Sequence, residues 1–429
     1  MKKILVYTIA IFCCIHTAFA QNNNSPYSII GLGDIEKSSF DRTSGMGHAG
    51  LALSSNRFFY YANPASYATM DNHFFNFEFS ARYQATSYTG VPITSGSDNT
   101  SSDLQFKRFG LAIKLKKFWT TSIGLQPFST VNYSFNSPVT IGGTPFLANA
   151  YVEGTGNTNM LYITNSFAIN KNLSIGVQSS YFFGQIEQDQ TFSTAVSDST
   201  LYSTTITSIY KPYFKLGVQY RTKLSKHWSV SAGATGSLKT SLNSSNSVVV
   251  KDGNTIIPNN QSYQDNQSYV ASSYALPLMY AGGIAATLNN AFTFAADYNY
   301  QGWNSLKNYN GLNNGLNYYI TNSNRFSFGG EYSKKITFKD KSFFERWFLQ
   351  TGFFYENSYL NMAGQQIKNI GATFGGGFNC LHNNMGVHAA VEIGSIGTTN
   401  NSLIKEDYSQ FTLTLSYRDF WFTHMKKYD

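Results

Sequence analysis

The chain has 429 residues, of which 16% are aromatic and only 13% are charged, and its formal charge is +8. The positive residues are scattered rather than gathered in one patch or on one helix, so we expect no nucleic-acid partner. Many aromatic residues, few charges and a mean hydropathy of −0.24 are typical of a barrel whose outer face meets lipid and whose lumen is polar.

Residues 1–20 have the form of a secretory signal peptide. Lys2 and Lys3 precede an apolar run over residues 4–15, and the small residues Ala18 and Ala20 mark a cleavage site. A transmembrane anchor needs about 20 apolar residues, and this run is shorter. We therefore predict cleavage after Ala20. Cys380 is then the last cysteine, which excludes an internal disulfide and a thiolate metal cluster, and no cofactor is expected.

Residues 21–72 show no sustained periodicity, but their apolar side chains need a surface to pack against. The stretch from Gly45 through Gly47 to Gly50 matches a dinucleotide-binding fingerprint by letter. That fingerprint works only between a strand and a helix, and neither is predicted here. Glycine permits close backbone packing, so we predict that residues 21–72 form a hatch that plugs a barrel built from residues 73–429.

The stretch from Phe75 to Ala85 alternates strictly between apolar and polar residues, with Glu78 and Arg82 on the polar face. A period of two over eleven residues predicts a β-strand. The same pattern returns at 109–115 and at 214–220, again with all charges on one face. A charge that faced lipid at the bilayer midplane would cost about 2–4 kcal/mol, so the charged face is assigned to the lumen.

The pattern predicts an all-β fold, a fourteen-stranded antiparallel transmembrane β-barrel. Tight turns alternate with long polar connections near 87–103, 134–158, 187–205 and 242–272. This asymmetry is typical of outer-membrane barrels and places both termini in the periplasm and the long loops outside the cell. The predicted strands lie near 73–86, 104–116, 119–133, 159–170, 173–186, 206–222, 228–241, 273–288, 291–303, 318–333, 346–358, 369–380, 385–396 and 404–418.

Several short motifs, in this order, resemble the outer-membrane long-chain fatty acid and hydrophobic-compound transporter family (FadL/TodX). The resemblance covers nearly all of the mature chain. It implies a fourteen-stranded barrel closed by a hatch, which takes a small fatty-acid-like or aromatic compound between its outer loops and releases it sideways into lipid. The motifs are the hatch residues Gly45, Gly47, Gly50, Asn63, Pro64 and Ala65, and the stretches 124–129, 276–277, 296–303 and 417–422.

Pro127 lies inside a predicted strand and cannot donate a ladder hydrogen bond. We therefore hypothesise that Pro127 and Phe128 border the lateral opening, with a bulge of no functional consequence as the alternative. Phe182, Tyr213 and Phe354 interrupt the polar lumen pattern. They are candidate ligand contacts, although packing against the hatch explains them equally well.

Four functional classes follow from these patterns. Transport of a small hydrophobic compound is the first expectation, and docking within a secretion or gliding assembly, with a protein partner, is the alternative. A polar porin conflicts with the predicted hatch. Catalysis is not expected, because the chain has no Gly-x-Ser-x-Gly elbow. In every case the protein is expected to be integral to the outer membrane and in contact with its lipid.

Overall fold

The structure is a computed structural model that describes residues 25–90, 99–140, 147–194, 197–252, 255–256, 274–306, 318–333, 347–380 and 384–420. The predicted signal peptide lies outside these residues. None of the helices that the structure describes is long and apolar enough to cross a membrane. They are short 3-10 turns: η2 (Pro26–Ile29), η3 (Arg42–Gly45), η4 (Pro64–Thr69), η5 (Trp303–Ser305) and η7 (Asn400–Ser402).

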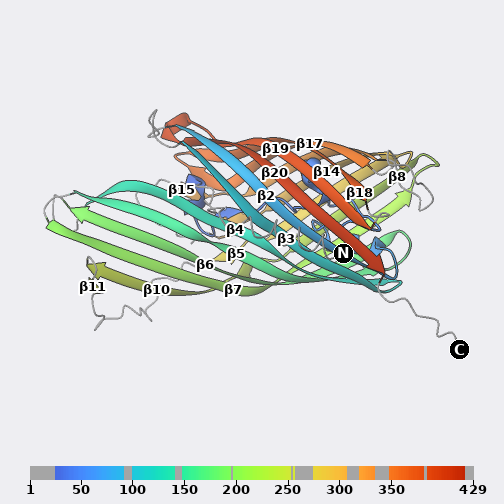
Figure 1. Ribbon diagram of the computed structural model, residues 1–429, viewed down its shortest axis with the longest axis horizontal. Helices are drawn as coiled ribbons and strands as arrows, with labels where there is room; N and C mark the ends of the chain where they lie inside the picture. Colours follow the sequence, from blue (N-terminus) through green and yellow to red (C-terminus); the bar gives the residue numbers. More distant parts are fainter. Residues whose placement is uncertain are drawn as a thin grey trace, which may run out of the picture.

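Fourteen antiparallel strands form a closed barrel, which confirms the predicted fold (Figure 1). Each strand pairs with the next along the chain, and the last strand pairs with the first through Phe74 and Phe420. The strands are β2 (Phe74–Gly90), β3 (Thr100–Lys116), β4 (Trp119–Thr140), β5 (Leu147–Ala168), β6 (Leu173–Thr194), β7 (Ser197–Lys223), β8 (Trp228–Ser237), β13 (Met279–Leu288), β14 (Phe292–Gln301), β16 (Ser323–Ser333), β17 (Trp347–Met362), β18 (Gln365–Cys380), β19 (Met385–Gly397) and β20 (Ile404–Phe420).

The alternation along each strand separates an apolar outer face from a polar inner face, as predicted. On β7, Phe214 and Leu216 are 58% and 59% exposed, whereas Gln219 is fully buried. On β2, Phe79 faces outward and Glu78 is buried. The apolar residues therefore cover the surface that meets lipid, and the charged residues line the lumen.

The strands extend well into the segments that were predicted as long loops. β4 to β7 reach further toward the left of Figure 1 than β2 and β20 do. The loops predicted near 134–158 and 187–205 are therefore mostly strand. Their Thr, Ile and Tyr residues have a high β-propensity that outweighs the Ser and Asn between them. The described residues form six further strands, five of two or three residues and one of ten: β1 (Asp34–Ile35), β9 (Thr240–Ser241), β11 (Thr255–Ile256), β12 (Ala275–Leu276), β15 (Tyr318–Ile320) and the longer β10 (Asn243–Asp252).

Residues 25–72, called the N-terminal segment below, pack against the inner faces of the strands. Ile30, Leu32, Met46 and Phe59 are each 1% exposed. One apolar cluster joins Ile30 and Leu32 to strand residues such as Phe182. Two further clusters form around Met46 and around Phe59. The apolar side chains of the N-terminal segment thus find their packing surface on the barrel wall.

Candidate functional site

The glycines of the N-terminal segment let its backbone touch the wall. Gly47 has a φ of +61°, and its N–H donates to Thr373 Oγ1 at 2.7 Å. A Cβ on Gly352 of β17 would lie 2.1 Å from the Gly47 nitrogen, and one on Gly45 would lie 2.8 Å from Gly375 Cα. Only glycine allows so close an approach from both sides.

Asn63, Pro64 and Ala65 form a second close contact with the wall. Asn63 Oδ1 caps η4 by accepting from Ala65 N at 3.0 Å. Asn63 Nδ2 donates to Leu51 O at 2.9 Å and to Val218 O on β7 at 3.0 Å. This one side chain therefore orders the N-terminal segment and also ties it to β7.

Carboxylates on three strands hold the middle of the N-terminal segment. Arg42 donates two hydrogen bonds to Glu331 on β16, at 2.9 and 2.6 Å. His48 Nε2 lies 2.6 Å from Glu392 Oε2 on β19. Asp297 on β14 accepts from the backbone nitrogens of residues 50 and 51 at 2.6 and 2.9 Å. Three strands are thereby bonded to the segment through charged groups, which form the stronger class of hydrogen bond.

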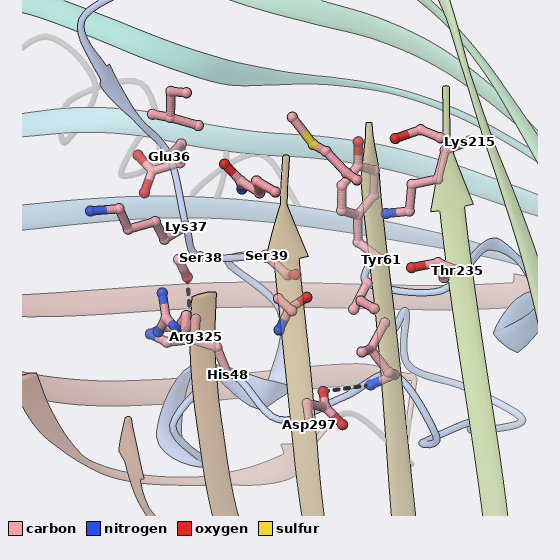
Figure 2. Close-up of a pocket in the computed structure, with 18 of the residues that line it drawn as sticks. Glu36, Lys37, Ser38, Ser39, His48, Tyr61, Lys215, Thr235, Asp297 and Arg325 are labelled. Atoms are coloured by element: carbon pink, nitrogen blue, oxygen red, sulfur yellow. Dashed lines mark hydrogen bonds between the residues drawn. The ribbon is translucent and has the colours of Figure 1, made fainter. Parts of the chain in front are cut away.

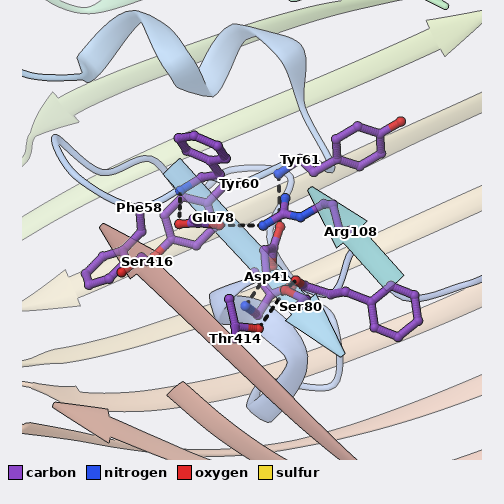
Figure 3. Close-up of polar contacts among 12 residues, drawn as sticks. Asp41, Phe58, Tyr60, Tyr61, Glu78, Ser80, Arg108, Thr414 and Ser416 are labelled. Atoms are coloured by element: carbon purple, nitrogen blue, oxygen red, sulfur yellow. Dashed lines mark hydrogen bonds and ion pairs between the residues drawn. The ribbon is translucent and has the colours of Figure 1, made fainter. Parts of the chain in front are cut away.

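A buried pair of Glu78 on β2 and Arg108 on β3 supports the next part of the segment (Figure 3). Glu78 also accepts from Phe59 N at 3.0 Å. Asp41 accepts from Tyr61 N at 2.9 Å beside this pair. Glu78 of the wall and Asp41 of the segment itself therefore each accept a hydrogen bond from the backbone of residues 59–61.

The neighbouring strands β3 and β4 separate from each other beside Pro127. The ladder between β3 and β4 ends at the pair of Phe109 and Leu125. Beyond that pair, β4 continues to pair with β5 on its other side. There Pro127 pairs with Asn159 and Ser129 pairs with Thr158, so that Phe128 is an extra, bulged residue between them. Pro127 thus lies at the end of a ladder and next to a bulge, where the loss of an N–H donor is tolerated.

The N-terminal segment covers the inner side of this separation. Strand β1 pairs with β4 at Ser129 and Thr130, and Glu36 N donates to Phe128 O at 2.7 Å. The Glu36 carboxylate lies 2.7 Å from Lys107 Nζ. Burial opposes its ionisation, but the attraction of Lys107 and of Arg82 lowers the pKa of Glu36 to about 2. A charged cluster and a short strand therefore occupy the place where an apolar passage was hypothesised.

The three candidate ligand contacts are packed and do not share an apolar cavity. Phe182 is fully buried and meets Phe128 edge to face, with ring centroids 5.0 Å apart. Phe354 packs 5.9 Å from the His48 ring. Tyr213 donates to Ser237 Oγ at 2.6 Å.

One lumen cavity of about 220 Å³ lies between the N-terminal segment and strands β4 to β8, β13, β14, β16 and β17 (Figure 2). Tyr213, Pro127 and Phe128 lie in its wall, whereas Phe182 and Phe354 do not. Most of the other wall residues are polar. The charged or ionisable groups among them are Glu36, Lys37, His48, Lys215, Asp297, Arg325 and Glu356. The cavity suits a hydrophilic guest better than a hydrocarbon.

The outer faces of β6 and β7 carry a row of exposed aromatic side chains, Tyr181, Phe183 and Tyr210. Phe183 pairs directly with Tyr210. Such rows mark the level at which a barrel wall leaves the hydrocarbon, yet β6 continues to Thr194. We call the part beyond this row the projecting sheet. It comprises residues 129–140, 147–158, 184–194 and 197–209, with β10, which pairs along β7.

The outer face of the projecting sheet carries three partly exposed carboxylates, Glu153, Glu187 and Asp189. Glu153 and Asp189 are directly paired across β5 and β6. Among the described residues, none of the three forms an ion pair with a cation. Tyr151 and Tyr202, each 41% exposed, flank the carboxylates. Like charges that lie opposite one another destabilise a sheet, and no ion pair among the described residues offsets the pair of Glu153 and Asp189.

The alternation over residues 214–220 assigned Lys215 to the lumen but not to a site. Alternation along a strand gives the face on which a charge lies, and it does not show which charges find partners. The long-range pairing of Glu36 with Lys107 had no sequence signal beyond the charges themselves. No group of three or more potential metal ligands is found among the described residues.

A family model described as BamG matches residues 1–429. No curated protein sequence matches the chain. A FadL homologue from Pseudomonas aeruginosa has a similar structure, with a TM-score of 0.59 and 13% identity over 91% of this chain and 100% of that one. The Pseudomonas putida toluene transporter TodX gives 0.55 and 14% over 91% and 100%. The Ralstonia pickettii toluene transporter TbuX gives 0.53 and 12% over 89% and 98%. These similar structures are transporter barrels, not enzymes.

Proposed function

We propose that this chain, which belongs to the BamG family, acts as a docking subunit of a larger outer-membrane assembly and binds its partner through the projecting sheet. The chain has the fold of the FadL/TodX outer-membrane transporters. In this proposal the N-terminal segment is a permanent hatch, both chain ends face the periplasm, and the projecting sheet lies outside the cell. The observation that carries the proposal is the continuation of β5, β6 and β7 beyond the aromatic row at Phe183 and Tyr210.

The filled lumen supports docking over passage of a solute. The N-terminal segment is bonded to β4 through β1, to β16 through Arg42 and to β19 through His48. The cavity of about 220 Å³ beside the segment is small, and charged groups such as Lys215 and Arg325 lie in its wall. A hydrocarbon that crossed this lumen would have to break several charge-assisted bonds, each stronger than an ordinary hydrogen bond.

The chemistry of the projecting sheet indicates a partner with a basic surface. Glu153, Glu187 and Asp189 offer three carboxylates on one face without ion-pairing cations among the described residues. The flanking Tyr151 and Tyr202 add rigid, amphipathic contact area, which is enriched at protein interfaces. Lys or Arg side chains of a partner would relieve the repulsion between Glu153 and Asp189.

Purification of the full chain from native membranes in mild detergent tests this function. We expect a stoichiometric protein partner that is released by raised salt and lost when Glu153→Gln and Glu187→Gln are combined. The control removes two exposed charges from the opposite rim, Lys171→Gln and Lys226→Gln, and should keep the partner. Recovery of the chain alone, or of a partner that the double carboxylate variant retains equally, would refute docking through this face.

Transport of a small hydrophobic compound is the second candidate, and the separation of β3 from β4 beside Pro127 favours it. In this proposal the N-terminal segment moves away from β4 and a ligand leaves between the two strands. Val in place of Pro127 restores a backbone donor, so Pro127→Val should slow the uptake of an apolar probe into reconstituted vesicles. Equal uptake by the variant and the wild type would count against a lateral exit at this place.

A further inference from the structure

One cation in the lumen cavity, Lys215, forms no ion pair among the described residues. Lys215 projects inward from β7, and its Nζ lies 5.0 Å from the centre of the Tyr61 ring. Asp41 is the carboxylate that acts on it electrostatically. The Asp41 oxygens already accept from Thr43 and from Tyr61 N.

Arg325 presents further unused donors from the other side of the same cavity (Figure 2). It lies on β16, is 8% exposed, and has its guanidinium 4.2 Å from the Phe354 ring. Its Nη1 is 3.6 Å from Glu356 Oε2. Its Nε and Nη2 are buried and have no hydrogen-bond partner. Buried donors without partners are costly, so an acceptor that fills the cavity would stabilise them.

Asp297 accepts from the backbone nitrogens of residues 50 and 51, and the other ionisable groups of the cavity wall have side-chain partners. Glu36 pairs with Lys107, Lys37 with Glu356, and His48 with Glu392. Lys215 is therefore a cation without an ion pair among the described residues, and Arg325 keeps two donors that its contact with Glu356 does not use.

Two acceptors complete the arrangement. Gln126 Oε1 and Asp297 Oδ1 belong to buried residues of the cavity wall, and neither atom has a hydrogen-bond partner. An amide oxygen and a carboxylate oxygen in this position suit a hydroxyl or ammonium group on the guest.

We propose that this cavity binds a small hydrophilic organic anion, with a carboxylate or phosphate group at Lys215 and a further acceptor group at Arg325. Its donor groups would meet Gln126 and Asp297. A volume of about 220 Å³ is below the roughly 300–1,000 Å³ of pockets that hold drug-sized ligands, so the guest is a small metabolite. The inference is independent of docking, because the projecting sheet takes no part in the cavity.

Calorimetric titration of the detergent-purified full chain tests the proposal with three probes: succinate, inorganic phosphate and octanoate. We expect saturable binding of succinate, of phosphate or of both, and the probe that binds identifies the anionic group. Lys215→Met should weaken that binding about 10- to 100-fold, because a hydrogen bond between charged groups is lost. Lys215→Arg keeps the charge and should stay within about tenfold of the wild type.

The matched control is Lys223→Met, which removes an exposed lysine from the same strand and should leave binding unchanged. Heat-dependent migration in detergent gels verifies that each variant is a folded barrel. Three results would overturn the proposal: no binding of succinate or phosphate by the wild type, binding of octanoate alone, or equal affinity in folded Lys215→Met. The first result would mean that the cavity holds only water.

Discussion

Glu36 Oε2 in the N-terminal segment lies 2.7 Å from Lys107 Nζ on β3, beside the place where β3 and β4 separate. The Lys107 side chain is 1% exposed and that of Glu36 is 16% exposed. A buried charge that loses its partner is strongly destabilising. This contact is therefore expected to hold the N-terminal segment against the separated wall.

Glu36→Gln should lower the free energy of unfolding by about 3–5 kcal/mol, because Lys107 would keep its buried charge without a carboxylate beside it. Urea denaturation followed by gel migration measures the change. Lys405→Met removes a pair whose side chains are 40% and 47% exposed, and it should cost at most about 1 kcal/mol. Equal losses of unfolding free energy in the two variants would show that the buried contact between Glu36 and Lys107 stabilises the fold no more than an exposed ion pair does.

The same carboxylate gives a pH dependence. The pKa of Glu36 is lowered from 4.5 to about 2 in the folded chain. A lowered folded-state pKa stabilises the fold above the unfolded value, and this stabilisation is lost as the pH falls through the folded value. The stability difference between wild type and Glu36→Gln should therefore be full at neutral pH and shrink between about pH 4.5 and pH 2. A constant difference over this range would contradict the assignment.

Gly352→Ala should disrupt the contact between β17 and the N-terminal segment. Its Cβ would lie 2.1 Å from Gly47 N, which is backbone and has no freedom to move aside. Overpacking of this kind costs about 1–3 kcal/mol or more. Gly282→Ala on β13 is the control, because nothing lies within 4 Å of its added Cβ. Thermal unfolding compares the two, and equal stability would mean that the segment adjusts freely.

The barrel was predictable because its wall depends on local alternation. Phe214 and Leu216 face outward and Lys215 faces inward, as a period of two requires. The length of the strands was not predictable, because the Ser- and Thr-rich residues of β7 resemble a loop until their partners on β6 and β10 are known. Pairing across the sheet decides such segments more than their own composition does.

The polar contacts of the lumen were less predictable because they depend on register. Strict alternation from Phe109 would place Lys107 on the lipid side of β3. A bulge opposite Ser80 and Ala81 adds one residue and turns Lys107 into the lumen, where it meets Glu36. Pro127 lies where the ladder between β3 and β4 ends, and its role at a lateral opening stays a prediction. The pairing of β1 with β4 at this place involves residues about ninety positions earlier, beyond the reach of a local pattern.

The bonds between the N-terminal segment and the barrel wall lead to a prediction about conductance. The intact chain should show only rare, small openings in planar bilayers, because Arg42, His48 and Asn63 bond the N-terminal segment to β16, β19 and β7. Removal of residues 21–63, with residues 1–20 kept for export, should open an aqueous path and give steady ohmic currents. Heat-dependent gel migration must show that the shortened chain is still a barrel. Free conduction by the intact chain would exclude a plugged lumen, whereas a folded but silent deletion variant would mean that other parts of the chain close the barrel.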